Sequence, residues 1–100
     1  MQKITEINLE ETIKKEDIEN YHFLKINFSF FDLSDKNFSN CKFERCNFSN
    51  ANLENSILDN VDFRWSNNFA IDPNINKIEK TKFSPETVVL LLRNLDIIID

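Results

Sequence analysis

The sequence contains no glycine, and it has only two prolines, two cysteines and one histidine in 100 residues. Without glycine, the chain has none of the glycine-rich loops that cradle phosphate groups in nucleotide-binding proteins. The longest apolar run, residues 88–92, is far shorter than the ~20 residues that a membrane-spanning helix needs. The first twenty residues also lack the apolar stretch of a secretory signal. We therefore expect a cytoplasmic protein with reduced cysteines and no membrane contact.

The residue types that catalysis and metal binding require are sparse. Cys41 and Cys46 are five residues apart and His22 is the only histidine, a set that does not resemble a zinc site. We expect both cysteines to be small core residues, with Cys41 stacked near Tyr21 and Val61 and not bonded to Cys46. His22 is expected on the surface. Because no catalytic constellation is visible either, we predict no enzymatic activity, no cofactor and no metal.

Composition nevertheless indicates a folded chain of one domain. Hydrophobic residues make up 41% of the sequence, and the net charge of −5 disfavours direct binding to nucleic acid or to an anionic membrane. Fifteen residues are asparagine. Asparagine tolerates left-handed backbone better than most residues, so it can replace glycine in turns. We therefore expect many similar turns.

An apolar residue recurs at every fifth position over half of the chain. The eleven consecutive members are Ile13, Ile18, Phe23, Phe28, Leu33, Phe38, Phe43, Phe48, Leu53, Leu58 and Phe63. A helix repeats every 3.6 residues and a strand every two, so a period of five drifts across the face of either. A coil whose straight sides each use five residues accounts for the pattern.

The segments ANLEN (51–55), CNFSN (46–50) and VDFRW (61–65) carry a more specific signal. They match or nearly match the consensus A(D/N)LXX, and the chain resembles the pentapeptide-repeat family, most clearly over residues 16–66. The resemblance implies an all-β solenoid, namely a right-handed quadrilateral parallel β-helix of about three coils, capped by a C-terminal α-helix. Four repeats would form each coil, so residues twenty apart should stack. One expected column is Phe23, Phe43, Phe63 and Phe83.

In this family the residue two before each repeat centre also points inward and is usually small. Tyr21, Ile26 and Phe31 are large at this position, and we expect them to plug the N-terminal end of the coil. Lys36 is also out of place there, because a buried lysine without a partner is costly. We expect its side chain to reach outward at a corner.

We divide the single pentapeptide-repeat domain, residues 1–100, into five parts. They are an N-terminal cap (1–15), regular repeats (16–66), a loop (67–77), closing repeats (78–84) and a C-terminal helix and tail (85–100). Ser84, Pro85 and Glu86 form a helix start, and the helix should run from about Pro85 to Arg93. Residues 97–99, all isoleucine, are interpreted as a short strand.

The C-terminal helix is apolar over most of its circumference, so covering the end of the coil leaves one apolar face unpartnered. It is similar in character to the closing helix of the dimeric quinolone-resistance members of the family. We therefore expect a symmetric homodimer, whose interface would comprise Val88, Val89, Leu90, Leu91, Leu92 and Leu95. A monomer with an apolar outer side is the alternative.

Our leading functional hypothesis is a bacterial, non-enzymatic protein that acts by protein–protein binding and self-association. The family also suggests an alternative, a DNA mimic that binds DNA gyrase or another type II topoisomerase. The candidate acidic surface for this role comprises Asp17, Glu19, Asp32, Asp35, Glu54 and Asp59, whereas the side centred on Phe23, Phe43 and Phe63 leans basic. A dimer of roughly 40 Å barely exceeds one turn of B-DNA, about 34 Å, and carries fewer charges. We therefore rank the DNA-mimic hypothesis below the hypothesis of protein–protein binding and self-association.

Overall fold

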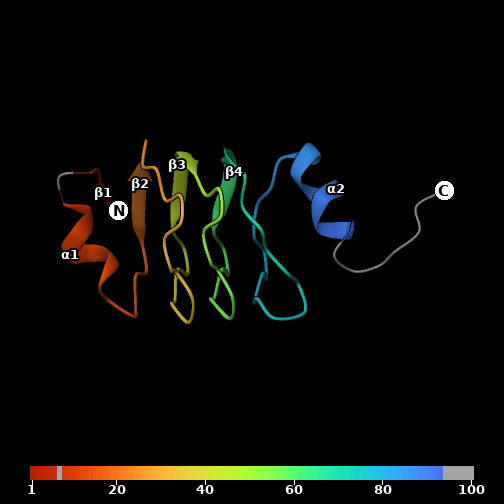
Figure 1. Cartoon of the computed structure of the whole chain (residues 1–100), viewed down its shortest axis with the longest axis horizontal. Coiled ribbons are helices and arrows are strands. Elements are labelled where there is room, and N and C mark those ends of the chain that lie inside the picture. The colour runs from red at the N-terminus through yellow and green to blue at the C-terminus, as the bar shows by residue number, and fades with distance from the viewer. Residues whose placement is uncertain (7, 94–100) are drawn as a thin grey trace.

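The computed structural model describes residues 1–6 and 8–93, and the molecule is elongated, 46 × 24 × 22 Å. A parallel sheet runs along its length, with one short helix at each end (Figure 1). The elements are β1 (Gln2–Ile4), α1 (Leu9–Ile13), β2 (Tyr21–Leu24), β3 (Lys42–Asn47), β4 (Asp62–Asn67) and α2 (Pro85–Arg93).

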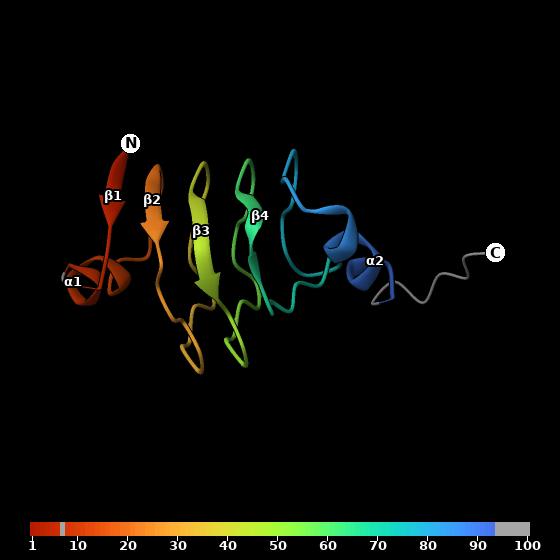
Figure 2. The same cartoon turned by 90° about the horizontal axis from the view of Figure 1, so that it is seen from above.

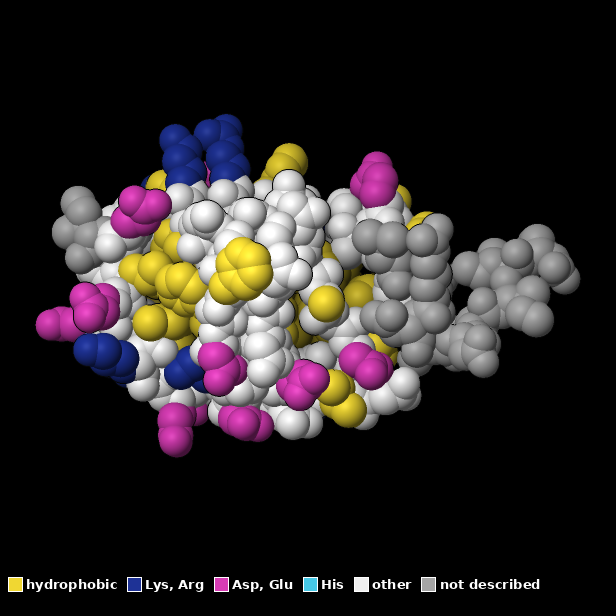
Figure 3. All heavy atoms as spheres, in the orientation of Figure 1, with side chains coloured by type: hydrophobic (Ala, Val, Ile, Leu, Met, Phe, Trp, Pro, Cys, Tyr) yellow, Lys and Arg dark blue, Asp and Glu magenta, His cyan; other side chains and the backbone are white. Residues whose placement is uncertain are grey.

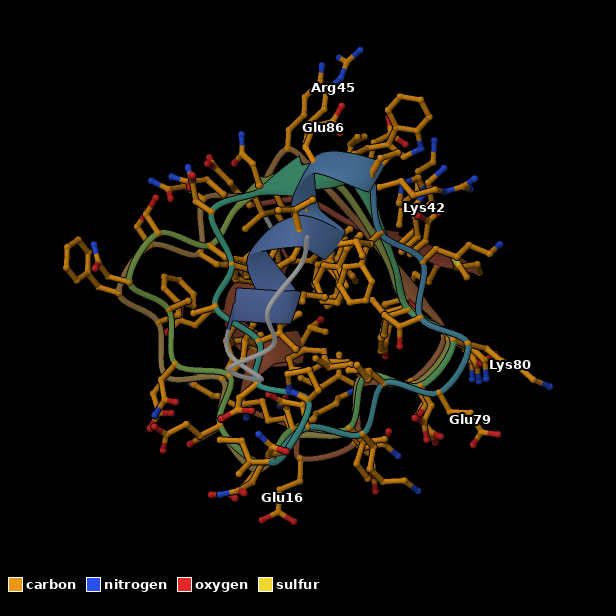
Figure 4. All side chains as sticks on the ribbon, turned by 90° about the vertical axis from the view of Figure 1, so that its right-hand side faces the viewer. Glu16, Lys42, Arg45, Glu79, Lys80 and Glu86 are labelled. Atoms are coloured by element: carbon orange, nitrogen blue, oxygen red, sulfur yellow. The ribbon has the colours of Figure 1, made fainter. Side chains whose placement is uncertain are left out.

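The chain is wound into a coil with twenty residues per turn. The strand order is β1-β2-β3-β4 and every pair is parallel, as Figure 2 shows from above. On another side of the coil, parallel bridges join Asp17 to Asn37, Asn37 to Ile57 and Ile57 to Lys77. Viewed along the axis, the turns superimpose into a four-sided outline (Figure 4). The fold is therefore a parallel β-solenoid.

A column of phenylalanine rings runs through the core of the solenoid. The rings of Phe23 and Phe43 are stacked with their centroids 4.9 Å apart, those of Phe43 and Phe63 are 5.3 Å apart, and those of Phe63 and Phe83 are 5.7 Å apart. Each pair is tilted by only 7°. This is the column that the repeat predicts, and the ring of Phe28 stacks on that of Phe48 at 5.1 Å in the same way.

Left-handed backbone at the corners explains the missing glycine. Nine consecutive corners, spaced five residues apart from Asn20 to Asn60, have φ between 54° and 66°, and five of the nine are asparagine. The Asn or Asp that precedes six of the repeat centres, at positions 27, 32, 37, 47, 52 and 62, supports the same turns. For example, Asn27 and Asn47 accept hydrogen bonds from the backbone N–H two residues later, at 3.0 and 3.2 Å. Short amides thus supply the turn geometry that glycine provides elsewhere.

The N-terminal end departs from the predicted repeat. Ile13 is not a repeat centre, because it ends helix α1. Instead, Ile4 of β1 pairs with Phe23 and is fully buried, with an offset of nineteen residues and not twenty. The end of the coil is covered by β1 and α1 (Figure 1), while Ile26 is buried within the first turn.

Polar side chains fill one inward column. The Lys36 ammonium donates a hydrogen bond to the Lys15 carbonyl oxygen at 3.0 Å, so its charge reaches the N-terminal segment, as expected of a residue that cannot stay buried alone. Further along the column, Asn76 Nδ2 donates to the carbonyl oxygen of Leu53 at 2.7 Å and to Ser56 Oγ at 3.1 Å. The column therefore has the hydrogen bonds that burial of polar groups requires.

The segment 67–77 was expected to be a loop that leaves the coil, and the structure corrects this in part. Phe69 packs into the aromatic core, with its ring centroid 4.7 Å from that of Phe63. Ile71 is buried. Because Lys77 still bridges Ile57, the segment keeps the twenty-residue register.

Helix α2 spans Pro85–Arg93, the range that the sequence predicts. The Ser84 carbonyl oxygen accepts the first backbone bonds, from Thr87 and Val88, and the Ser84 and Thr87 hydroxyl oxygens are 2.9 Å apart. The short strand expected at residues 97–99 lies outside the described residues. Neither described helix is long and apolar enough to cross a membrane.

Candidate functional site

Helix α2 presents an apolar face away from the coil. Leu91 is buried, with 8% of its surface exposed, and so covers the end of the core. Val88 and Val89 are 39% and 47% exposed. The structure thus separates the expected interface residues, because Leu91 belongs to the protomer core and the two valines face outward. The side chains of Leu90 and Leu92, and all of Leu95, lie outside what the structure describes.

The predicted acidic residues lie on two sides of the solenoid. Asp17, Glu19 and Asp59 flank the column of Ile18 and Leu58, and Asp32, Asp35 and Glu54 flank that of Leu33 and Leu53. All six except the half-buried Asp59 are exposed. Figure 3 shows many of the visible acidic side chains along one long edge of the molecule.

Three of these carboxylates have local partners that reduce their availability. Asn37 Nδ2 donates a hydrogen bond to Asp17 Oδ1 at 3.3 Å. Lys77 Nζ is 3.6 Å from Asp59 Oδ2, and the Glu79 backbone N–H donates to Asp59 at 2.9 Å. Hydrogen bonds from the Ser34 hydroxyl and backbone N–H lower the pKa of Asp32 and keep it charged. The acidic surface therefore consists of carboxylates on two adjoining sides of the coil, and part of their charge is offset by local partners.

The outer face of β2 and β3 holds a network of ionisable side chains. His22 Nε2 lies 3.1 Å from Glu44 Oε1, and Lys42 Nζ lies 3.5 Å from the same oxygen. Burial alone would raise the pKa of Glu44, but the hydrogen bond from His22 and the positive charge of Lys42 lower it overall. His22 was expected on the surface, but its side chain is only 13% exposed and it contacts Glu44.

A second pair lies on β4. Arg64 Nε and Nη2 donate to the two carboxylate oxygens of Asp62, at 3.0 and 2.9 Å. Burial tends to raise the pKa of Asp62, yet the bonds from Arg64 lower it overall. This fork-shaped pairing fixes the direction of the Arg64 side chain.

The two thiols are buried and free, as the sequence predicts. Burial raises the pKa of the Cys41 thiol to about 12 and that of Cys46 to about 11. Cys41 Sγ donates to the Ile18 carbonyl oxygen, and Cys46 Sγ approaches the Phe23 carbonyl oxygen at 3.6 Å. Both therefore stay protonated at neutral pH, and neither is placed as a nucleophile. Within residues 1–6 and 8–93, no three His, Cys, Asp or Glu side chains gather as a metal site would require.

Sequence reasoning missed one exposed aromatic residue, Trp65. By the five-residue frame it should turn a corner, as Lys25 and Arg45 do with φ of 54° and 55°. Instead, the pairing register shifts and Trp65 lies opposite Glu44, within strand β4. Its side chain is 62% exposed. Bulk at a corner position could not have found it, because Phe30 is also bulky and does turn a corner with φ of 65°.

Comparison with known proteins agrees with the repeat. The family model of pentapeptide repeats matches residues 25–64 in eight copies. This segment is therefore a run of pentapeptide repeats, and it contains the centre of the solenoid, from Lys25 to Arg64.

A search of curated proteins finds no match to the chain. Among solved structures, the chain is similar to QnrB1 (M102R, trypsin-treated), described as a plasmid-mediated fluoroquinolone resistance protein. The identity is 12%, the match covers 99% of this chain and 95% of that one, and the TM-score is 0.33. A likeness of this strength carries no conclusion about fold or function.

Proposed function

We propose that this is a cytoplasmic, non-enzymatic pentapeptide-repeat protein that acts by protein–protein binding and self-association. The observation that carries the proposal is the outward face of α2, where Val88 and Val89 are exposed beside the buried Leu91. A helix that covers the coil with one face and exposes valines on another is suited to a symmetric contact. The fold proposed with it is the right-handed quadrilateral β-helix, which the four-sided outline in Figure 4 supports.

Light scattering on purified variants tests this self-association. The wild-type mass should be twice the 11.9 kDa of the chain, and Val89→Glu should give a folded protein of 11.9 kDa. Ile75→Glu is the matched control, because Ile75 is 44% exposed but lies outside α2. If the wild type is monomeric, or if both variants dissociate it equally, self-association through α2 is wrong.

A DNA mimic that binds DNA gyrase or another type II topoisomerase is the second candidate. The exposure of Asp32, Asp35 and Glu54 on one side favours it. Length does not count against it, since the molecule spans 46 Å and one turn of B-DNA about 34 Å. The length of roughly 40 Å expected for a dimer was too short, because the single chain already spans 46 Å.

The small number of acidic residues is the main argument against DNA mimicry. A supercoiling assay with gyrase tests the DNA-mimic hypothesis. The wild type should inhibit supercoiling, and neutralising Asp32, Asp35 and Glu54 together as amides should relieve the inhibition. The same change at Asp17, Glu19 and Asp59, on the other side, serves as the comparison. Absence of inhibition by the folded wild-type protein at micromolar concentration would eliminate this function.

A further inference from the structure

The side of the solenoid built by β1 to β4 is positively charged in an otherwise acidic molecule. We define the basic face as the outward residues of these strands and the corner that follows each strand. Its charged members are Lys3, Glu6, Lys25, Lys42, Glu44, Arg45, Asp62 and Arg64, and we add Lys82, which bridges Asp62 as the next rung of this side. Its net charge is +3, whereas that of the whole chain is −5. Viewed along the axis, Lys42 lies between the corners that carry Arg45 and Lys80 (Figure 4).

The carboxylates on the basic face are largely offset by their neighbours. Glu44 is held by His22 and Lys42, and Asp62 is held by Arg64. Lys25 and Arg45 are exposed and successive on one corner, and they form no ion pair among the described residues. These two cations are therefore available to an incoming anionic group.

Trp65 adds an apolar wall beside these cations. Together with Lys42, Glu44 and Arg45 it lines a shallow hollow of about 350 Å³. A second hollow, of about 440 Å³, is lined by Thr5, Glu6, Leu24 and Lys25. Because Leu24 pairs with Glu44 across the strands, the two hollows are neighbours along the corner. Along this corner, a bound chain would therefore meet apolar side chains (Leu24 and Trp65) and cationic side chains (Lys25 and Arg45) in turn.

The local backbone explains why Trp65 stays uncovered. A register shift places Trp65 opposite Glu44, and such irregularities re-aim side chains at functional edges. The bridge between Asp62 and Lys82 is the last pairing of this sheet in the described residues, because the chain turns into α2 at Pro85. No later described strand therefore covers the end of β4.

We propose that this corner, formed by Lys25 and Arg45 with Trp65 of β4 beside them, binds an acidic peptide segment of a partner protein that carries apolar side chains between its carboxylates. Tryptophan and arginine are the residues that most often anchor protein interfaces, and the charge of the face is complementary to carboxylates. Nucleic acid fits less well, because Glu44 and Asp62 interrupt the cations and the chain as a whole repels a polyphosphate. This inference rests on the proposed function of protein binding.

Trp65 provides a direct readout, because it is the only tryptophan in the sequence. The probe is a fluorescein-labelled synthetic peptide of alternating aspartate and leucine, with an asparagine–leucine peptide as its control. Unlabelled acidic peptide should shift the Trp65 emission to shorter wavelength, and the control should not. Anisotropy of the labelled peptide gives the Kd, which should weaken as salt is raised, since exposed charges are screened.

Two matched variants distinguish this corner from general charge attraction. Arg45→Asn and Lys80→Asn each remove one cation at a corner with positive φ, and asparagine occupies the equivalent corners elsewhere in the coil. Arg45→Asn should weaken peptide binding about fivefold, whereas Lys80→Asn should change it by less than about twofold. Thermal melting confirms that both variants are folded.

Three results would overturn the proposal. They are a Trp65 emission that the acidic peptide leaves unchanged, equal effects of the two variants, and tighter binding of a single-stranded oligothymidine than of the peptide. Light scattering on the same samples measures the oligomeric state, and so it shows whether only the peptide site is wrong or the proposed self-association as well. If the protein is dimeric and Trp65 does not respond, only the peptide site is wrong.

Discussion

At the scale of single residues, stability rests on the phenylalanines that stack from turn to turn. Phe43 is fully buried and lies between the rings of Phe23 and Phe63, each tilted by 7° from it. Its ring also meets the edges or faces of three more phenylalanines, Phe28, Phe38 and Phe48. Such pairs contribute beyond the area that they bury.

Phe43→Ala should lower the free energy of unfolding by about 3–5 kcal/mol, because it opens a cavity in the middle of the column. Chemical denaturation measures this loss. Phe30→Ala is the matched control, since Phe30 is 78% exposed and should change stability by less than about 0.5 kcal/mol. Equal effects of the two substitutions would contradict the inward assignment of Phe43.

The buried thiols make a second prediction at this scale. Burial raises the pKa of Cys41 to about 12 and of Cys46 to about 11, so both remain thiols at pH 8. Labelling with an aromatic disulfide reagent should therefore be slow in the native protein and fast in denaturant. Glu54→Cys, at an exposed position, should add one rapidly reacting thiol. Rapid labelling of two thiols in the native wild type would show that the cysteines are accessible.

At the scale of elements, the sequence predicts the repeats better than the ends. The five-residue period places Phe23, Phe43 and Phe63 in one column, because every regular side consumes the same number of residues. It misassigns Ile13 and does not locate β1, where the offset changes to nineteen. A count of residues cannot reveal such a shift, since the offset depends on how the first helix docks against the coil.

The same limit applies to the candidate surfaces. The bounds of α2 follow from Ser84 and Pro85, but the inward position of Leu91 depends on the docking angle of the helix. Trp65 is exposed because β4 contains a register shift that the repeat does not encode. By contrast, the five-residue repeat does predict which sides carry cationic and which carry acidic residues, because corners and outward positions recur every five residues.

Leu91 and Val88 provide a paired test of how α2 docks. Leu91→Ala should lower the free energy of unfolding by about 2–3 kcal/mol, because Leu91 is buried against the coil. Val88→Ala should cost less than about 1 kcal/mol, because Val88 is 39% exposed, and its effect is measured in the monomeric Val89→Glu background. The reverse order would contradict the inward placement of Leu91.

At the scale of the whole molecule, low pH should weaken the ion pairs on the outer face of the sheet, such as that of Asp62 with Arg64. The pKa of Asp62 is lowered from its ordinary 3.8 in the folded protein. A carboxylate of this kind stabilises the fold above its ordinary pKa, and the contribution disappears as pH falls through the lowered value. The difference in Tm between the wild type and Asp62→Asn should therefore shrink below pH 3.8. A difference that stays constant with pH would contradict the pairing, and Glu54→Gln serves as the exposed control.

The central claim is that an elongated coil associates end to end through α2. Small-angle X-ray scattering tests it most directly, because the protomer is 46 Å long but only 24 × 22 Å across. An end-to-end dimer should have a maximum dimension near twice that of the monomeric Val89→Glu variant, with an unchanged cross-section. A dimer no longer than the monomer would show side-by-side association, and would contradict the account.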